Sequence, residues 1–238
     1  MSPYEKRWQA VAERIAVAAM RVGRDPQQIR VLAVSKGQPA EAVRDAWNGG
    51  QRAFGENYVQ EAAAKMEQLG SLPDTEWHLI GPLQGNKSRV AAARFAWVQS
   101  IDRAAIAHKL SQARLQSLPP LDCCVQVNIS GETAKHGCTP QDAVALAATV
   151  AGLPRLRLRG FMGIASETDD AGVQRVQFAR LRAIFQQAIE RGFALDTLSM
   201  GMSGDLEAAI AEGSTLVRIG SALFGERRAY RRGEPTAA

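Results

Sequence analysis

The chain has 238 residues, of which 46% are hydrophobic and 22% charged, and this balance is typical of a soluble globular protein. No apolar run reaches about 18 residues, so the sequence predicts no membrane span. Charged residues interrupt the N-terminal segment, which is not typical of a secretory signal, and we expect a cytoplasmic protein. The net charge is +5, but no basic stripe interleaved with aromatic residues occurs, and we expect no nucleic-acid partner.

The three cysteines, Cys123, Cys124 and Cys138, form no pattern typical of a disulfide framework or a metal site. Cys123 and Cys124 are adjacent in a strand-like run, so their side chains should point to opposite faces. We interpret the cysteines as buried apolar residues and expect no bound metal.

Helical segments and short apolar strands alternate along the chain, beginning with an amphipathic helix over residues 4–22 and a strand over residues 31–36. Asp102 is expected to cap the helix after the fourth strand, and Thr139 with Pro140 to begin the helix after the fifth. The remaining strands are expected at residues 52–56, 77–81, 97–101, 123–129, 156–164, 197–201 and 216–219.

Eight such units with short connections predict an α/β fold with a parallel sheet, and their number favours closure into a (β/α)₈ TIM barrel with an extra N-terminal helix. The alternative is an open doubly wound sheet, in which the strands lie in a different order. No linker divides the chain, so residues 1–238 are expected to form a single domain with a frayed tail over about 228–238.

Lys36 stands at the end of the first predicted strand, which is the end where barrels build their active sites. Burial lowers the pKa of a lysine and makes its amine a nucleophile that can form a Schiff base. The alternative is a strand-end lysine whose side chain extends to water.

Glycine and serine residues follow the seventh and eighth predicted strands, and these two loops often hold a phosphate in barrels. Hydroxyls and backbone N–H groups suit an anion, and glycine allows a close backbone approach. The alternative is a pair of ordinary tight turns with capping serines. The residues concerned are Ser199, Gly201, Ser203, Gly204, Gly220 and Ser221.

Two polar residues lie within apolar strands. Arg218, if it faces the barrel interior, requires a partner, which could be a ligand ring nitrogen, a phosphate or a carboxylate such as Glu56. His78 is interpreted either as a core histidine with satisfied hydrogen bonds or as a catalytic residue.

Taken together, these residues resemble the pyridoxal phosphate homeostasis protein family (YggS/PROSC-like proteins), whose barrel is similar to the N-terminal domain of alanine racemase. The most specific segment is Ser-Met-Gly-Met-Ser at residues 199–203. The resemblance covers nearly the whole chain, through residues 33–36, 54–61, 77–87, 126–132, 160–162, 198–210 and 217–220.

The resemblance implies a fold-type III barrel that holds pyridoxal 5'-phosphate (PLP) as a Schiff base on Lys36. It implies that Arg218 faces the pyridine nitrogen and that Lys135 occupies the position of a loop lysine of the family. The other residues implied to contact the cofactor are Asn57, His78, Ser199, Met200, Gly201, Ser203, Gly220 and Ser221. The implied function is PLP homeostasis, in which the protein buffers PLP or delivers it to PLP-dependent apo-enzymes.

A racemase needs a second acid or base on the opposite face of the cofactor, and in alanine racemase-like enzymes a second domain supplies it as a tyrosine. This chain leaves no residues for that domain, and Tyr4, Tyr58 and Tyr230 have no evident route to the role. We therefore expect no catalytic residue, little or no turnover, and a monomer. The alternatives are a PLP-dependent racemase, a Schiff-base aldolase acting on a sugar phosphate, and a nucleic-acid or protein interaction module.

Overall fold

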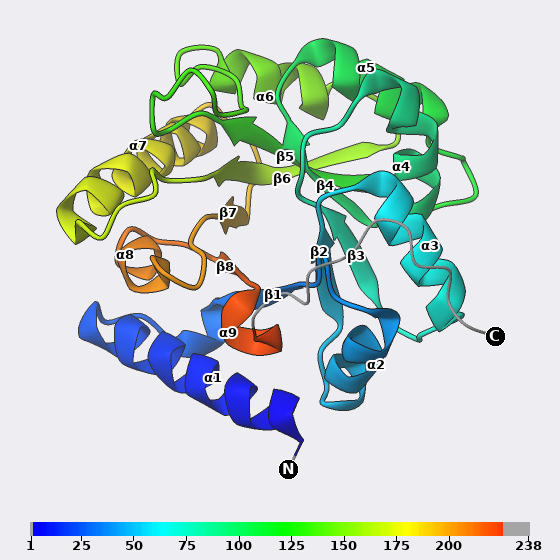
Figure 1. Cartoon of the computed structure of the whole chain (residues 1–238). Coiled ribbons are helices and arrows are strands. Elements are labelled where there is room, and N and C mark those ends of the chain that lie inside the picture. Colours follow the sequence, from blue (N-terminus) through cyan, green and yellow to red (C-terminus); the bar gives the residue numbers. More distant parts are fainter. Residues whose placement is uncertain (1, 226–238) are drawn as a thin grey trace.

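The computed structural model describes residues 2–225, which form a closed barrel of parallel strands in the order β1-β2-β3-β4-β5-β6-β7-β8. Figure 1 shows the helices arranged around the outside of this barrel. The last strand pairs with the first, with Ile219 beside Ala33, and this closure excludes the open doubly wound sheet. The predicted (β/α)₈ barrel is therefore confirmed, whereas the frayed tail expected at 228–238 lies outside the described residues.

The barrel strands are β1 (Arg30–Val34), β2 (Ala53–Glu56), β3 (Glu76–Leu79), β4 (Trp97–Ile101), β5 (Leu121–Val127), β6 (Leu156–Gly163), β7 (Thr197–Ser199) and β8 (Leu216–Ile219). The helices are α1 (Pro3–Arg21), α2 (Ala40–Asn48), α3 (Val59–Leu69), α4 (Ser88–Arg94), α5 (Ala104–Ala113), α6 (Ala143–Ala151), α7 (Ala171–Glu190), α8 (Leu206–Ala211) and α9 (Ser221–Phe224), with short 3-10 segments at η1 (Pro26–Gln28) and η2 (Gly85–Lys87).

The extra N-terminal helix α1 begins with a capping box, in which Ser2 and Glu5 satisfy each other's backbone N–H groups. Its buried face includes Val11 and Ile15 and joins a core cluster with residues of β8, α8 and α9. Figure 1 shows α1 lying beside α8 and α9, so this helix supports the elements that follow β7 and β8.

Residues of each strand alternate between the barrel interior and the surrounding helices. Leu32, Ala53 and Leu216, from three strands, pack together inside the barrel, whereas Ala33 packs outward in a cluster with helix residues. Continued past the end of β1, this alternation directs Ser35 outward and Lys36 toward the interior side.

The two adjacent cysteines follow the same alternation. Cys123 packs in the outer cluster with helix residues, whereas Cys124 packs inside the barrel with Trp97 and Met162. The predicted opposite orientation of these side chains is confirmed, and burial raises the pKa of both thiols.

Several predicted boundaries were wrong. Strand β1 ends at Val34 rather than at residue 36, because Ser35 accepts a turn hydrogen bond from the N–H of Gln38. Asp102 does not cap α5; its carboxylate pairs with Arg103, which occupies the N-cap position. Helix α6 begins at Ala143 rather than near residue 139.

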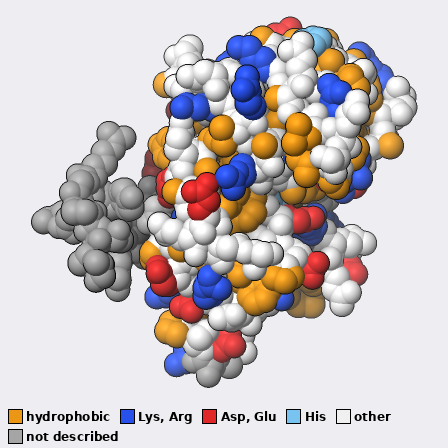
Figure 2. Space-filling model, turned by 90° about the vertical axis from the view of Figure 1, so that its right-hand side faces the viewer, with side chains coloured by type: hydrophobic (Ala, Val, Ile, Leu, Met, Phe, Trp, Pro, Cys, Tyr) orange, Lys and Arg blue, Asp and Glu red, His pale blue; other side chains and the backbone are white. Residues whose placement is uncertain are grey.

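Among the described residues, no helix is both long enough and apolar enough to span a membrane. On the face drawn in Figure 2, basic and acidic side chains are interspersed with hydrophobic ones. The described residues also contain no cluster of His, Cys, Asp and Glu side chains that could hold a metal ion.

Candidate functional site

The predicted site residues converge at the carboxyl ends of the strands. Strand register sets Val34 beside Gly55, and a Cβ at Gly220 would lie 3.4 Å from the carbonyl oxygen of Val34. Lys36, two residues beyond β1, is half-buried. It therefore stands between the segment after β2 and the segment after β8, at the end where barrels build their sites.

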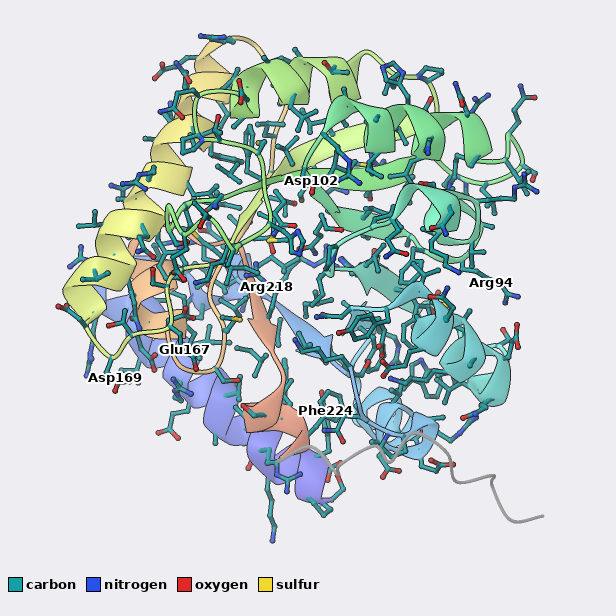
Figure 3. All side chains as sticks on the ribbon, turned by 45° about the horizontal axis from the view of Figure 1, so that its top comes forward. Arg94, Asp102, Glu167, Asp169, Arg218 and Phe224 are labelled. Atoms are coloured by element: carbon teal, nitrogen blue, oxygen red, sulfur yellow. The ribbon has the colours of Figure 1, made fainter. Side chains whose placement is uncertain are left out.

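Arg218 lies inside the barrel and is 4% exposed. Its guanidinium donates to the carbonyl oxygen of Ser199 at 2.7 Å, to the Ser199 hydroxyl at 2.9 Å and to the carbonyl oxygen of Gly163 at 2.9 Å. Figure 3 shows Arg218 among the strands and away from the outer helices. Burial lowers the pKa of Arg218 to about 10, so the group remains charged at neutral pH.

Glu56, the carboxylate suggested as a partner of Arg218, does not contact it. Glu56 is completely buried on the outer side of β2, where it accepts hydrogen bonds from Ser35 and from Lys65 of α3. The reason is the alternation of β2, in which Ala53 faces inward and Glu56, three positions later, faces outward. Arg218 is instead held by neutral oxygens, and its charge is available to a ligand.

A chain of hydrogen bonds crosses the barrel interior from β3 to β8. The Gln99 amide nitrogen lies 2.9 Å from Nδ1 of His78, and the Ser199 hydroxyl donates to the Gln99 carbonyl oxygen at 2.7 Å. Ser199 in turn accepts a hydrogen bond from Arg218. The sequence reasoning missed Gln99, whose signal was its place two residues after the inward-facing Trp97.

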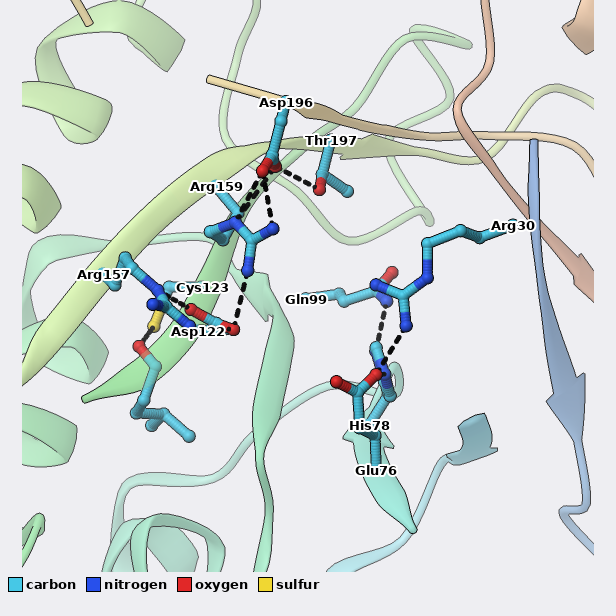
Figure 4. Close-up of polar contacts among 11 residues, drawn as sticks. Arg30, Glu76, His78, Gln99, Asp122, Cys123, Arg157, Arg159, Asp196 and Thr197 are labelled. Atoms are coloured by element: carbon cyan, nitrogen blue, oxygen red, sulfur yellow. Dashed lines mark hydrogen bonds and ion pairs between the residues drawn. The ribbon is translucent and has the colours of Figure 1, made fainter. Parts of the chain in front are cut away.

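His78 belongs to this interior chain and is completely buried. Its ring stacks on Trp97 with centroids 4.9 Å apart, and burial lowers its pKa. Nε2 lies 3.6 Å from a carboxylate oxygen of Glu76, too far for a hydrogen bond, and Arg30 binds that same carboxylate (Figure 4). The His78 ring is thus satisfied at Nδ1 only, because Nε2 is buried and has no hydrogen-bond partner among the described residues. The role of His78 as a cofactor contact stays a prediction.

The segment after β7 offers backbone donors. Within residues 2–225, the N–H groups of Ser203 and Gly204 have no hydrogen-bond partner, and neither has that of Ser221 at the start of α9. Gly201 has a φ of +96°, and a Cβ there would lie 2.6 Å from Ala209, so this turn requires glycine. These N–H groups are suited to an anion.

Two of the residues implied to contact the cofactor make contacts within the barrel itself. The hydroxyl of Ser199 is engaged by both Gln99 and Arg218. Met200 packs its side chain in the outer core, while its N–H binds Leu216 and its carbonyl oxygen accepts from Ser214. Ser199 thus orients Arg218. Met200 anchors the loop after β7 to the core outside the barrel.

Asn57 is half-buried directly after β2 and is packed tightly by the next strand end. A Cβ at Gly81 would lie 2.3 Å from the Asn57 carbonyl oxygen and 2.7 Å from its Cα, so only glycine fits there. The Gly81 backbone therefore fixes where Asn57 stands at the rim of the barrel.

The loop after β5 is organised by Asn128 and carries Lys135. The Asn128 side chain donates to the carbonyl oxygens of Glu132 and Lys135 and accepts from the N–H of Gly131. The Lys135 ammonium lies 2.9 Å from the Glu132 carboxylate and donates to the Ala165 carbonyl oxygen at 2.9 Å. Lys135 thus links its loop to the segment that follows β6.

A second group of charged side chains, on β5, β6 and the residue before β7, forms ion pairs among its own members. Asp122 binds both Arg157 and Arg159, and Arg159 also binds Asp196 at 2.6 Å (Figure 4). These residues belong to the first halves of their strands or precede a strand, away from the carboxyl ends. We assign this cluster to stability rather than to ligand binding.

Comparison with known proteins assigns the chain to a family. The sequence matches the family described as alanine racemase, N-terminal domain, over residues 7–228, and the chain belongs to that family. The barrel resembles alanine racemase of Clostridium difficile with a TM-score of 0.69 at 14% identity, covering 92% of this chain and 57% of that one, which indicates a shared fold alone.

Closer relatives are pyridoxal phosphate homeostasis proteins. The chain is 55% identical to that of Pseudomonas aeruginosa over 217 residues, covering 91% of this chain and 93% of the relative. It is 49% identical to that of Escherichia coli over 220 residues, covering 91% and 94%. PipY of Synechococcus elongatus, solved with PLP bound, has a TM-score of 0.78 and 38% identity, covering 90% of this chain and all (100%) of PipY. The resemblance to the pyridoxal phosphate homeostasis proteins is confirmed.

Proposed function

We propose that this chain binds PLP and serves PLP homeostasis, with the cofactor held covalently on Lys36 and with little or no turnover. The curated relatives carry the name of this function, and PipY binds PLP. In the proposed function the protein buffers PLP in the cytoplasm, or delivers it to PLP-dependent apo-enzymes, and acts as a monomer.

The observation that carries the proposal is the buried guanidinium of Arg218 in the same barrel end as Lys36. Its hydrogen bonds go to neutral oxygens, so the charge inside the barrel is not cancelled by a carboxylate bound to it. A pyridine nitrogen carries a lone pair that a charged donor can bind. The arrangement therefore suits an aromatic nitrogen ligand.

The remaining groups suit the rest of the cofactor. The free N–H groups of Ser203, Gly204 and Ser221 are suited to the phosphate, and Asn57 stands at the rim near Lys36. The Lys36 amine is the nucleophile that would bond to the cofactor aldehyde with loss of water. PLP supplies an electron sink when bound, and the donor Arg218 would keep its ring nitrogen unprotonated and so weaken that sink.

The proposal of little turnover rests on the tyrosines. Tyr4 is buried on α1, outside the barrel, with its ring 6.0 Å from that of Phe224, and burial raises its pKa. Tyr58 is 63% exposed, and Tyr230 lies outside the described residues. Neither described tyrosine suits the second acid or base that racemisation requires. A PLP-dependent racemase remains the alternative function.

The test is an absorbance titration of the purified protein with PLP, in the wild type and in Lys36→Ala. We expect the band of a lysine Schiff base in the wild type only, because the variant lacks the amine. The variant should still bind PLP non-covalently through Arg218 and the phosphate loops. An identical band in both proteins would contradict the assignment of Lys36.

A further inference from the structure

The residues on both sides of Lys36 are tied to helix α3. Ser35, on the preceding side, accepts a hydrogen bond through its carbonyl oxygen from the Lys65 ammonium at 2.8 Å. Gly37, on the following side, donates its N–H to the Glu61 carboxylate at 2.7 Å. The turn that carries Lys36 is thus held at both ends by a helix outside the barrel.

These contacts form one buried ionic cluster. The Lys65 ammonium binds the Glu56 carboxylate at 2.6 Å and lies 3.5 Å from that of Glu61. The Ser35 hydroxyl donates to the same Glu56 oxygen at 2.6 Å. Lys65 is 5% exposed and Glu56 is completely buried. We call Lys65, Glu56, Glu61 and Ser35 the α3 clamp.

The burial of the α3 clamp indicates that these charges do more than stabilise the fold. A buried ion pair often contributes no more stability than apolar side chains of similar volume, because desolvation offsets the attraction. Such a pair does fix geometry, since each charge must meet its partner at one distance and angle. Here the ammonium with three donors reaches Ser35, Glu56 and Glu61 together.

The turn itself needs this support. Strand β1 ends at Val34, and the ladder that fixes the strand does not extend to Lys36. Gly37 has a φ of +69°, a conformation that glycine adopts freely and that other residues rarely adopt. Contacts of this turn with neighbouring elements can therefore set the direction of the Lys36 side chain.

We propose that the α3 clamp positions the amine of Lys36, an inference that rests on the proposed function of that amine. Lys65, Glu56 and Glu61 are positioning residues that contact the turn and not the cofactor. The clamp sets how fast the Lys36 nitrogen attacks the PLP aldehyde carbon to form a carbon–nitrogen double bond and release one water. It leaves the Arg218 and phosphate contacts unchanged.

The first test uses a matched pair of variants at Glu61, whose side chain is 32% exposed. Glu61→Gln keeps an oxygen that can accept the Gly37 N–H, whereas Glu61→Ala removes it. We expect the rate constant for attachment of PLP to Lys36, followed by borohydride trapping and mass spectrometry, to fall roughly three- to tenfold in Glu61→Ala. Glu61→Gln should retain a rate near that of the wild type.

The second test removes the buried charges together, because Lys65→Met alone would strand the Glu56 carboxylate. In Lys65→Met/Glu56→Gln we expect the attachment rate to fall at least about tenfold. Pyridoxamine 5'-phosphate, which lacks the aldehyde, should bind with an affinity within about twofold of the wild type, since it uses the ring and phosphate contacts alone. This split between attachment and binding is not expected from general loosening of the fold.

The control is Arg114→Met. Arg114 is another buried cation, 6% exposed, which donates to the carbonyl oxygens of Ala92 and Phe95 far along the chain from Lys36. Its loss should lower stability without slowing attachment. The inference is overturned if Lys65→Met/Glu56→Gln attaches PLP at the wild-type rate, if Arg114→Met slows attachment equally, or if pyridoxamine 5'-phosphate binding falls in parallel.

The same data separate this inference from the proposed function. A wild type that attaches no PLP at Lys36 overturns both. A wild type that attaches PLP, with clamp variants that attach it equally fast, overturns the clamp and leaves the function standing. If the double variant does not fold, the Glu61 pair decides: equal rates in Glu61→Ala and Glu61→Gln overturn the clamp.

Discussion

At the scale of single residues, the barrel interior links a neutral histidine to a charged arginine. The link consists of one side-chain amide and one hydroxyl. Gln99 and Ser199 connect His78 to Arg218 without any carboxylate in the chain of hydrogen bonds. A neutral His78 suits this arrangement, since its Nδ1 can accept from the Gln99 amide. Protonation of His78 would break that hydrogen bond and add a second buried positive charge.

We predict that protonation of His78 destabilises the fold in acid. Burial lowers its folded pKa below the unfolded value of about 6.5, so the unfolded state binds the extra proton. The contribution of neutral His78 to the free energy of unfolding is fully present above that unfolded pKa. It is lost as the pH falls below it, by at most about 1.4 kcal/mol per pH unit. Urea unfolding at pH 7.5, 6.5 and 5.5 measures the slope.

His78→Gln should show a shallower decline with falling pH than the wild type, because the titrating group is gone. His108→Gln, at an exposed position on α5, is the control and should decline as the wild type does. Identical slopes in wild type and His78→Gln would show that His78 does not titrate between the two states.

At the scale of elements, helix α1 holds the two loops that carry the proposed phosphate contacts. The Arg14 guanidinium donates to both oxygens of the Glu207 carboxylate, through Nε and Nη2. It also donates to the Ser203 carbonyl oxygen at 3.0 Å. Arg7 donates to the carbonyl oxygen of Phe224, at the end of α9. The extra helix therefore supports the ligand end of the barrel in addition to covering its side.

We predict that Arg14→Ala weakens PLP binding roughly two- to fivefold, the range that a partly exposed ion pair can contribute. The Ser203 loop loses an anchor, while the barrel keeps its core. Arg94→Ala is the matched control, since Arg94 forms an ion pair of similar exposure with Glu67 on α3. Isothermal titration with PLP measures both, and an equal loss in the two variants would contradict the role of Arg14.

Gly81 lies against the backbone of Asn57, so a side chain at this position should disturb both the fold and the site. Gly81→Ala would bring a Cβ to 2.3 Å from the Asn57 carbonyl oxygen, and backbone must move to relieve the overlap. We expect a loss of about 1–3 kcal/mol in unfolding free energy together with weaker PLP binding, as Asn57 shifts at the rim. Gly152→Ala, where the nearest atom is 3.5 Å away, should change stability by less than about 0.5 kcal/mol.

The sequence was sufficient to predict the barrel because each strand and helix carries its own periodicity and the alternation leaves one closed arrangement. It was not sufficient for Gln99 and Lys65, whose roles depend on groups far away in sequence: the Ser199 hydroxyl for Gln99 and the Ser35 carbonyl oxygen for Lys65. The end of β1 was predicted two residues too late, because the turn hydrogen bond from Gln38 to Ser35 has no signal in the apolar pattern of the strand.

At the scale of the whole molecule, one barrel accounts for nearly all the described residues, and the chain matches only 57% of the length of an alanine racemase. Within residues 2–225, the groups that form the candidate site come from the barrel strands and the loops that follow them. Neither Tyr4 nor Tyr58 is suited to be the second acid or base, and we propose a monomer that holds PLP rather than one that turns over amino acids.

We predict that the PLP-loaded protein exchanges the α-proton of L-alanine in D₂O at a rate far below an ordinary enzyme turnover of about 1–10³ s⁻¹. Proton NMR follows the loss of the α-proton signal, and free PLP at equal concentration gives the background. Exchange in the enzyme range would support the racemase alternative and contradict the proposal of a holding protein.

Mapping where PLP attaches tests most directly whether Lys36 holds the cofactor. The wild type is incubated with PLP, reduced with borohydride and digested, and its peptides are analysed by mass spectrometry beside those of Lys36→Ala. We predict one phosphopyridoxyl group on the peptide that contains Lys36, and none on the corresponding peptide of the variant. Attachment at another residue such as Lys135, or equal labelling of the two proteins, would contradict the account.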